Sequence, residues 1–251
     1  MSLNVAHGRM LARQQIFVRR HKFPLNLSRV AAVFRREAAD VVALQEADGP
    51  SFWSGGFHHV DRLASLAGYD HHFWGEHNSV RFGRRQVSCG TALLSRHPLH
   101  GPASFVFEPT PPVGRKGFVV ATLPLPGTRG CRVDVVSVHL DFLRKASRRR
   151  QILEMEQALA DRANPLIILG DMNCWWRRRN DALKLLVERL NVYPCRPEDK
   201  ELATFPSRRP ILRIDWILIS PELEFASYGI VGDQVSDHLG VVADVRMSPA
   251  A

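Results

Sequence analysis

Acidic, amide and histidine side chains recur in this sequence at points where apolar strands end or are interrupted. The positions of this kind are Asn4, Glu46, His139, Asp171 with Asn173, Asp215, and Asp237 with His238. A carboxylate beside a buried strand costs desolvation energy unless something compensates it, and a metal ion compensates several such groups at once. If these side chains converge at one rim of the fold, they therefore form a site for a hard divalent cation.

The type of ligand limits which cation fits such a site. Carboxylate and amide oxygens favour Mg²⁺ or Mn²⁺, whereas a structural zinc site needs a set of Cys and His ligands. The four cysteines are widely spaced with no Cys-x-x-Cys pair, which predicts free and mostly packed thiols. His139 and His238 remain for proton transfer, because an imidazole titrates near neutral pH.

The elements that must position these residues alternate between helical and strand patterns. One-sided apolar periodicity over 27–39 predicts a helix starting near Ser28, and 147–163 predicts another with Ser147 as its N-cap. A further helix fits 181–190. Apolar runs without alternation, at 41–44, 132–138 and 166–169, predict strands buried on both faces. The patterns at 213–219, 223–231 and 240–245 predict strands bounded by turns.

The order of these elements indicates the fold class. About ten strands with few long helices do not make a simple alternating β-α series, so we expect an α/β sandwich of two mixed sheets with outer helices. A Pro-rich segment at 109–117 is a long loop between apolar runs, and the composition does not change across it. We therefore expect a single domain over 1–251.

Composition and charge exclude several classes of protein. A chain of 251 residues with 45% hydrophobic and 24% charged content is neither collagen, a coiled coil nor wholly disordered. The 34 Lys and Arg against 25 Asp and Glu give a net charge of +9, which favours a polyanionic partner or simply solubility. Because no segment has the apolar core of a signal peptide or the roughly 20 apolar residues that span a bilayer, we expect a cytoplasmic protein.

Eight short motifs, in order along nearly the whole chain, resemble those of the endonuclease/exonuclease/phosphatase superfamily of metal-dependent phosphodiesterases. Any one of them arises by chance in many proteins, whereas the ordered set is specific to the superfamily. The motifs are Leu3-Asn4-Val5-Ala6-His7-Gly8-Arg9, Leu44-Gln45-Glu46, Gly90-Thr91-Ala92-Leu93-Leu94-Ser95-Arg96, Val138-His139-Leu140, Gly170-Asp171-Met172-Asn173, Thr204-Phe205-Pro206-Ser207, Arg213-Ile214-Asp215-Trp216-Ile217 and Ser236-Asp237-His238.

The resemblance implies a four-layer α/β/β/α sandwich of the DNase I-like type, with one divalent-metal site at the strand ends. It implies that Glu46 is the main metal ligand and that Asp237 and Asn4 complete or flank the shell. The metal expected is Mg²⁺ or Mn²⁺.

The resemblance also implies catalytic roles. Asp171 and Asn173 would position the attacking water and a phosphate oxygen. His238, oriented by Asp215, would be the general base or would stabilise the transition state. His139 would contact the phosphate or protonate the leaving oxygen. Apolar neighbours favour burial of Asp215 against His238 over a surface ion pair with an arginine.

Several further residues are candidates for contact with the substrate. His7 either touches substrate or stabilises its own loop, and the paired tryptophans either stack on a base, enter a lipid surface or pack partly in the core. The basic run after them would attract phosphate. These candidates are His7, Arg9, Arg115, Trp175, Trp176 and Arg177. Clustered histidines at 58–59, 71–72 and 77 lack a matching carboxylate pattern, and we expect them on the surface.

These features together predict a metal-dependent phosphodiesterase in which water attacks a phosphate in line, most directly a nuclease acting on DNA or RNA. One alternative is a phospholipid or phosphoinositide head-group phosphodiesterase or phosphatase, with Trp175 and Trp176 as a membrane contact. A catalytically inactive nucleic-acid-binding module is a third reading, against which the intact acidic and histidine set argues. The expected partners are nucleic acid or another phosphodiester and, peripherally, an anionic membrane; no obligate protein partner is evident.

Overall fold

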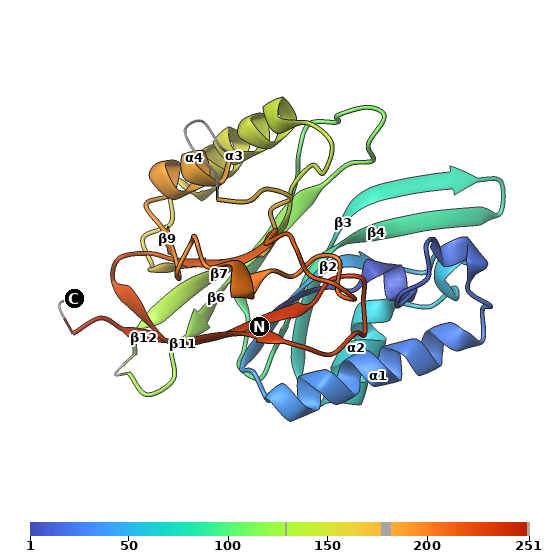
Figure 1. Cartoon of the computed structure of the whole chain (residues 1–251), viewed down its shortest axis with the longest axis horizontal. Coiled ribbons are helices and arrows are strands. Elements are labelled where there is room, and N and C mark those ends of the chain that lie inside the picture. Colours follow the sequence, from blue (N-terminus) through green and yellow to red (C-terminus); the bar gives the residue numbers. More distant parts are fainter. Residues whose placement is uncertain (129, 177–181, 250–251) are drawn as a thin grey trace.

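The computed structural model of the chain describes residues 1–128, 130–176 and 182–249 and contains helices and strands in the order expected of a sandwich (Figure 1). The strands are β1 (Ser2–Asn4), β2 (Val41–Asp48), β3 (His71–Phe82), β4 (Arg85–Ser95), β5 (His100–Val106), β6 (Gly117–Pro124), β7 (Arg132–His139), β8 (Leu166–Asp171), β9 (Tyr193–Pro194), β10 (Asp215–Ile219), β11 (Leu223–Val231) and β12 (Gly240–Met247). The α-helices are α1 (Lys22–Glu37), α2 (His59–Ala67), α3 (Lys145–Leu159) and α4 (Ala182–Arg189).

The strands form two six-stranded sheets. One has the order β11-β12-β1-β2-β4-β3 and the other the order β5-β6-β7-β8-β10-β9. Both are mixed, because β1 pairs with β2 in parallel and β7 pairs with β8 in parallel, whereas their other pairings are antiparallel. The first and last strands, β1 and β12, are neighbours.

Each sheet buries both faces, which explains why several strands are unbroken apolar runs. Leu44 of β2 packs toward α1 and α2, whereas the preceding residue Ala43 packs between the sheets. Trp216 of β10 packs toward α3 and α4, whereas Ile217 packs between the sheets. The helix pairs therefore cover the two outer faces (Figure 1), and the predicted four-layer α/β/β/α sandwich is confirmed.

Two predicted helix starts were wrong. Helix α1 begins six residues earlier than expected, at Lys22, because Phe23 and Leu27 bury the same face as the later apolar residues. Ser28 does not cap this helix but donates a hydrogen bond to Pro24 O one turn back. Helix α3 begins at Lys145, ahead of the predicted cap Ser147.

Two strands extend beyond their neighbours as a hairpin. Strand β2 ends at Asp48, opposite Cys89 of β4, but β3 and β4 continue to pair as far as Phe82 and Arg85 (Figure 1). We call residues 79–88 the β3–β4 arm. None of the described helices is long and apolar enough to cross a membrane.

Candidate active site

The topology brings the predicted polar positions to one end of the two sheets. Asn4 ends β1, and Glu46 lies near the end of β2, which runs parallel to β1. His139 ends β7 and is paired in register with Asp171, which ends the parallel strand β8. Asp215 begins the antiparallel strand β10 directly opposite Asp171. The carboxyl ends of parallel strands and the amino end of an antiparallel neighbour therefore meet at this edge.

Asp171 is the hub of the site and joins the two sheets. Its Oδ2 accepts a hydrogen bond of 3.0 Å from the side-chain amide of Asn4, which comes from the other sheet. The same oxygen lies 3.5 Å from His139 Nε2 and 3.8 Å from His238 Nε2. All four side chains are buried. A carboxylate and two imidazoles thus meet in a place where charge is poorly screened.

Asp215 orients His238, as the apolar neighbours of Asp215 led us to expect. Its Oδ2 lies 2.9 Å from His238 Nδ1 and accepts a second hydrogen bond, of 2.5 Å, from Thr204 Oγ1. Arg213 does not compete for this carboxylate, since its guanidinium stacks on the Trp216 ring at 3.9 Å. The imidazole therefore presents its other nitrogen, Nε2, to Asp171.

The charges of this group are set by burial and by its neighbours. Burial lowers the pKa of His238, but the carboxylates of Asp215 and Asp171 outweigh that effect and raise it to about 10. Burial and the nearby charge of Asp215 raise the pKa of Asp171 to about 7, although His238 opposes the shift. At neutral pH the site therefore holds a cationic imidazole beside a carboxylate that exchanges its proton easily.

His139 stays neutral because it is buried and because a lysine lies against it. Lys116 Nζ is 3.2 Å from each of the two ring nitrogens of His139. Burial and this ammonium group hold the pKa of His139 well below its ordinary value. The positive charge on this side of the site therefore belongs to Lys116, and His139 offers a neutral imidazole.

Two residues of the site have an unusual backbone conformation, which sets the direction of their side chains. Glu46 has φ of 51° at an irregularity in the β2–β4 pairing between Leu44 and Ala47. Asn173 has φ of 49°; its backbone N–H donates to Asp171 Oδ1 and its side-chain amide donates to Leu140 O. Left-handed conformations of residues other than glycine are uncommon and concentrate at functional sites. Asn173 in this structure fixes the turn that follows Asp171.

The proposed metal ligands are the more accessible carboxylates of the site. The side chains of Glu46 and Asp237 are 20% and 25% exposed, so a hydrated ion can reach them. Each faces a protein cation: Glu46 lies 3.3 Å from His7 Nε2, and Asp237 accepts a hydrogen bond of 2.7 Å from Arg9. Burial raises the pKa of Glu46, but the positive groups around it, His7 first, lower it below its usual range.

The donor types of these residues suit a hard divalent cation. The two carboxylates and the amide oxygen of Asn4 are oxygen donors of the kind that Mg²⁺ and Mn²⁺ prefer. Asn4 lies between the two parts of the site, because its side chain bonds to Asp171 and its backbone O accepts from Ser236 Oγ, whose neighbour in the chain is Asp237. A metal ion here would compete with Arg9 for Asp237 and would lie beside the contact of Glu46 with His7.

The remaining substrate candidates lie at the margins. Arg115 is exposed, and its backbone N–H bonds to Asn78 of β3. Trp175 and Trp176 are half-buried and line a cavity of about 740 Å³, together with Lys184 of α4. Trp176 also packs against the core under α3 and α4. Arg177 lies outside the residues that the structure describes.

The histidine clusters correct one expectation. His59 and His77 are not on the surface: they are 0% and 4% exposed. His59 Nε2 bonds to Ser54 O, and the ring of His77 lies against Gly117 at the start of β6. Both residues occupy inward-facing positions of their elements, which the lack of a carboxylate partner in the sequence could not reveal.

Two buried residues of the site were missing from the predicted set. Asp48, two residues after Glu46 in β2, binds His7, and Thr204 supports Asp215. The spacing of Asp48 from Glu46 on one strand was a usable signal. Thr204 stood in a recognised motif, but nothing in its local sequence indicates that its hydroxyl reaches a residue eleven positions later.

The fold and the residues gathered at this end of the sheets define a class of protein. Its members are two-sheet α/β sandwiches with acidic and histidine side chains at the strand ends. The family model described as the endonuclease/exonuclease/phosphatase family matches residues 1–238, and the chain belongs to that family. Members of the family are hydrolases acting on phosphoester bonds, generally with a divalent metal.

Individual relatives are distant. The Escherichia coli (strain K12) protein YbhP is 26% identical over 225 residues, covering 85% of each chain. The crystal structure of an endonuclease/exonuclease/phosphatase from Beutenbergia cavernae superposes with a TM-score of 0.74 at 21% identity, covering 98% of this chain and 70% of that one. A mannosyl-6-phosphatase from Bacteroides thetaiotaomicron gives a TM-score of 0.67 at 14% identity, covering 89% and 91%. The two solved structures establish the fold alone.

Proposed function

We propose that the protein is a Mg²⁺- or Mn²⁺-dependent phosphodiesterase that hydrolyses nucleic acid, DNA or RNA. The observation that carries the proposal is the buried junction in which Asp171 lies within 3.5 Å of His139 and 3.8 Å of His238. Phosphodiester cleavage builds negative charge on the phosphate and needs a base for the attacking water. A proton-exchanging carboxylate between two differently charged imidazoles supplies both requirements.

The charge of each residue determines its role in the cleavage of the phosphodiester. A divalent ion held by Glu46, Asp237 and Asn4 would polarise the phosphate and help neutralise its charge. Asp171, with a pKa near 7, accepts the proton of the attacking water. His238, kept cationic with a pKa of about 10, stabilises the charge that develops on the phosphate.

The opposite side of the site binds the phosphate from a second direction. His139 hydrogen-bonds a phosphate oxygen as a neutral imidazole, and Lys116 beside it contributes the positive charge. Because both groups are fixed before substrate arrives, they stabilise the transition state without reorganising.

The β3–β4 arm supports nucleic acid as the substrate. The arm begins where β2 ends, two residues beyond Glu46, and projects from the end of the sheet that holds the site. Arg81, Arg84 and Arg85 on the arm are exposed. A polymer lying across the site would meet these charges with phosphates flanking the scissile one, which a small phosphomonoester could not do.

A substrate panel tests this proposal. Purified protein is incubated with plasmid, single-stranded DNA, RNA, a sugar phosphate, inositol phosphates and anionic phospholipid vesicles, each with Mg²⁺, Mn²⁺ or EDTA. We expect cleavage of a nucleic acid that EDTA abolishes and that Asp171→Asn lowers by about 10²–10⁴-fold. His97→Gln is the matched control, since His97 pairs with a carboxylate, Asp40, far from the site.

Other outcomes would overturn the substrate assignment. Hydrolysis of sugar or inositol phosphates, with nucleic acid left intact, would make the protein a phosphatase of the same fold. Hydrolysis of phospholipid would favour the head-group alternative, although the half-buried positions of Trp175 and Trp176 provide no exposed membrane contact. Nuclease activity equal in the wild type and in Asp171→Asn would come from a contaminant.

A further inference from the structure

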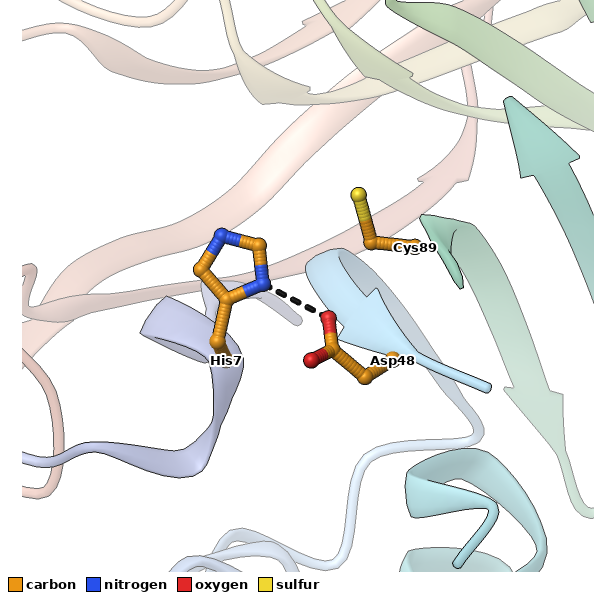
Figure 2. A group of neighbouring side chains, drawn as sticks. All are labelled: His7, Asp48 and Cys89. Carbon is orange, nitrogen blue, oxygen red and sulfur yellow. Dashed lines mark hydrogen bonds and ion pairs between the residues drawn. The ribbon is translucent and has the colours of Figure 1, made fainter. Parts of the chain in front are cut away.

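His7 lies between two carboxylates of one strand. Its Nδ1 is 2.6 Å from Asp48 Oδ1, and its Nε2 is 3.3 Å from Glu46 Oε2 (Figure 2 shows the contact with Asp48). His7 belongs to a short 3₁₀ turn, Ala6–Gly8, that directly follows β1. Its side chain is 16% exposed.

Asp48 is committed to holding the imidazole in place. Its side chain is 0% exposed, and its second oxygen, Oδ2, accepts hydrogen bonds from Trp53 Nε1 and Ser54 Oγ. Three donors therefore fix the carboxylate, and the carboxylate keeps a proton on Nδ1 of His7. Carboxylates hold metal-binding histidines in this way, since the bond orients the ring; a metal ion that displaces the second proton of the cationic imidazole then binds the lone pair of Nε2.

The turn that carries His7 has an unusual, left-handed backbone conformation. Ala6 and His7 have φ of 48° and 52°, and Gly8 has φ of 71°. Consecutive left-handed residues that include alanine cost conformational energy, which other contacts must offset. One such contact is the hydrogen bond from Ala6 N–H to Asn4 Oδ1, which links the turn to a proposed metal ligand.

The spacing of His7 and Glu46 matches that of two ligands of one ion. Donor atoms each about 2.1 Å from a metal are about 3.0–3.4 Å apart at octahedral to tetrahedral angles. The separation of 3.3 Å between Nε2 and Oε2 falls in this range. Cys89, the third member of the group in Figure 2, is not required, because its thiol interacts with the Asn78 side chain.

We propose that His7, presented by Asp48, is a nitrogen ligand of the metal held by Glu46. This inference rests on the metal site of the proposed function and deepens it, because an imidazole nitrogen changes which ion the site prefers. Mg²⁺ favours an all-oxygen shell, whereas Mn²⁺, Co²⁺ and Zn²⁺ accept nitrogen readily. The site should therefore bind Mn²⁺ more tightly than Mg²⁺ through a direct bond to His7.

The test measures the ligand itself in full-length protein loaded with Mn²⁺. Pulsed electron paramagnetic resonance detects ¹⁴N coordinated to Mn²⁺, and calorimetry gives the affinities for Mn²⁺ and Mg²⁺. We expect nitrogen coupling in the wild type that is absent in His7→Gln. We also expect at least a tenfold loss of Mn²⁺ affinity in His7→Gln and a 10–100-fold loss in Asp48→Asn, with a smaller change for Mg²⁺. His97→Gln, which changes a partly exposed histidine paired with Asp40, should change neither measurement.

Two results would overturn the inference while leaving the metal site in place. Mn²⁺ bound without nitrogen coupling would mean an all-oxygen shell, and coupling that survives in His7→Gln would mean that a nitrogen other than that of His7 binds the ion. Tighter binding of both ions to His7→Gln would mean that His7 is a protein cation competing with the metal for Glu46. If the wild type binds no Mn²⁺ at all, the metal site of the proposed function fails as well. Should His7→Gln not fold, Asp48→Asn and the wild-type spectrum still decide.

Discussion

At the scale of single residues, the site depends on pairs of groups that shift one another's pKa. Asp215→Asn keeps the shape of the His238 partner and removes its charge. We expect the pKa of His238 to fall from about 10 toward its ordinary value near 6.5, because the largest opposing charge is lost. Activity should fall by about 10²–10⁴-fold. The pKa is measured by NMR titration of the imidazole.

The control for this change is Asp40→Asn, which removes a carboxylate from an exposed histidine pair. It should leave the activity and the titration of His238 unchanged. A His238 pKa that stays near 10 in Asp215→Asn would mean that Asp171 alone holds the charge, and the positioning role of Asp215 would be wrong.

A second prediction at this scale concerns a histidine outside the site. Burial and the nearby Lys116 lower the pKa of His77 to about 3. The unfolded chain binds this proton below about pH 6.5, whereas the folded chain does not, so the free energy of unfolding decreases as the pH falls through this window. The contribution is about 2–3 kcal/mol between pH 6.5 and 4.5.

In His77→Gln, the free energy of unfolding should fall by about 2–3 kcal/mol less than in the wild type between pH 6.5 and 4.5. Urea unfolding at several pH values measures this difference. His72→Gln, an exposed histidine on the same strand, is the control and should leave the slope unchanged. Equal slopes in the wild type and in His77→Gln would show that His77 protonates without unfolding.

Sequence reasoning singled out residues whose signal is local and overlooked residues whose signal is tertiary. Asp171, Asp215 and His238 stand next to buried strands, so their type and place indicated a site. His77 carries no such signal, since only the packing of β3 against β6 makes it buried. Asp48 did carry a local signal, its spacing from Glu46 on β2, but its partner His7 reaches it from another element.

At the scale of elements, the close pairing of strands fixes the position of Asp171. A Cβ added at Gly170 would lie 2.0 Å from Val138 O, and Gly170 has φ of 151°. Gly170→Ala therefore has to push β8 away from β7, and we expect it to destabilise the fold by about 1–3 kcal/mol and to reduce activity. Thermal unfolding and the nuclease assay measure the two effects.

The matched control is Gly229→Ala in β11, where an added Cβ meets nothing within 4 Å. It should change stability by less than about 1 kcal/mol and leave the rate intact. If Gly170→Ala matched this control in both measurements, close packing at the β7–β8 pair would not position Asp171.

Element types were predictable, but their ends were not. The apolar periodicity identified α1, yet its first turn contains Lys22 and Pro24, which local rules do not favour over the better cap Ser28. The irregularity of β2 at Glu46 was also hidden, because it depends on how β4 pairs with β2. In both features tertiary contacts override local preference, and the second lies at the site.

At the scale of the whole molecule, the charge distribution should govern how nucleic acid binds. Neutralising Arg81, Arg84 and Arg85 together should lower the slope of log affinity against log salt by about 2–3 for duplex DNA, because each phosphate contact contributes about 0.9. Binding is measured in EDTA, so that no turnover occurs. The rate at saturating substrate should change little.

The control neutralises Arg132 and Arg246, which lie at the opposite ends of β7 and β12 from His139 and His238. If the slope of log affinity against log salt fell as much in this double variant as in the arm variant, the net charge of the protein would attract the polymer. The arm would then have no particular role in binding.

The adjacency of β1 and β12 has a consequence for biosynthesis. Asn4 is translated more than 200 residues before His238, yet both contact Asp171. A nascent chain in which His238 is not yet translated cannot complete the centre, so the hydrolysis that we propose cannot begin before that point. Two separately expressed pieces that divide the chain between β6 and β7 would each be inert, and activity on mixing them would report their reassociation.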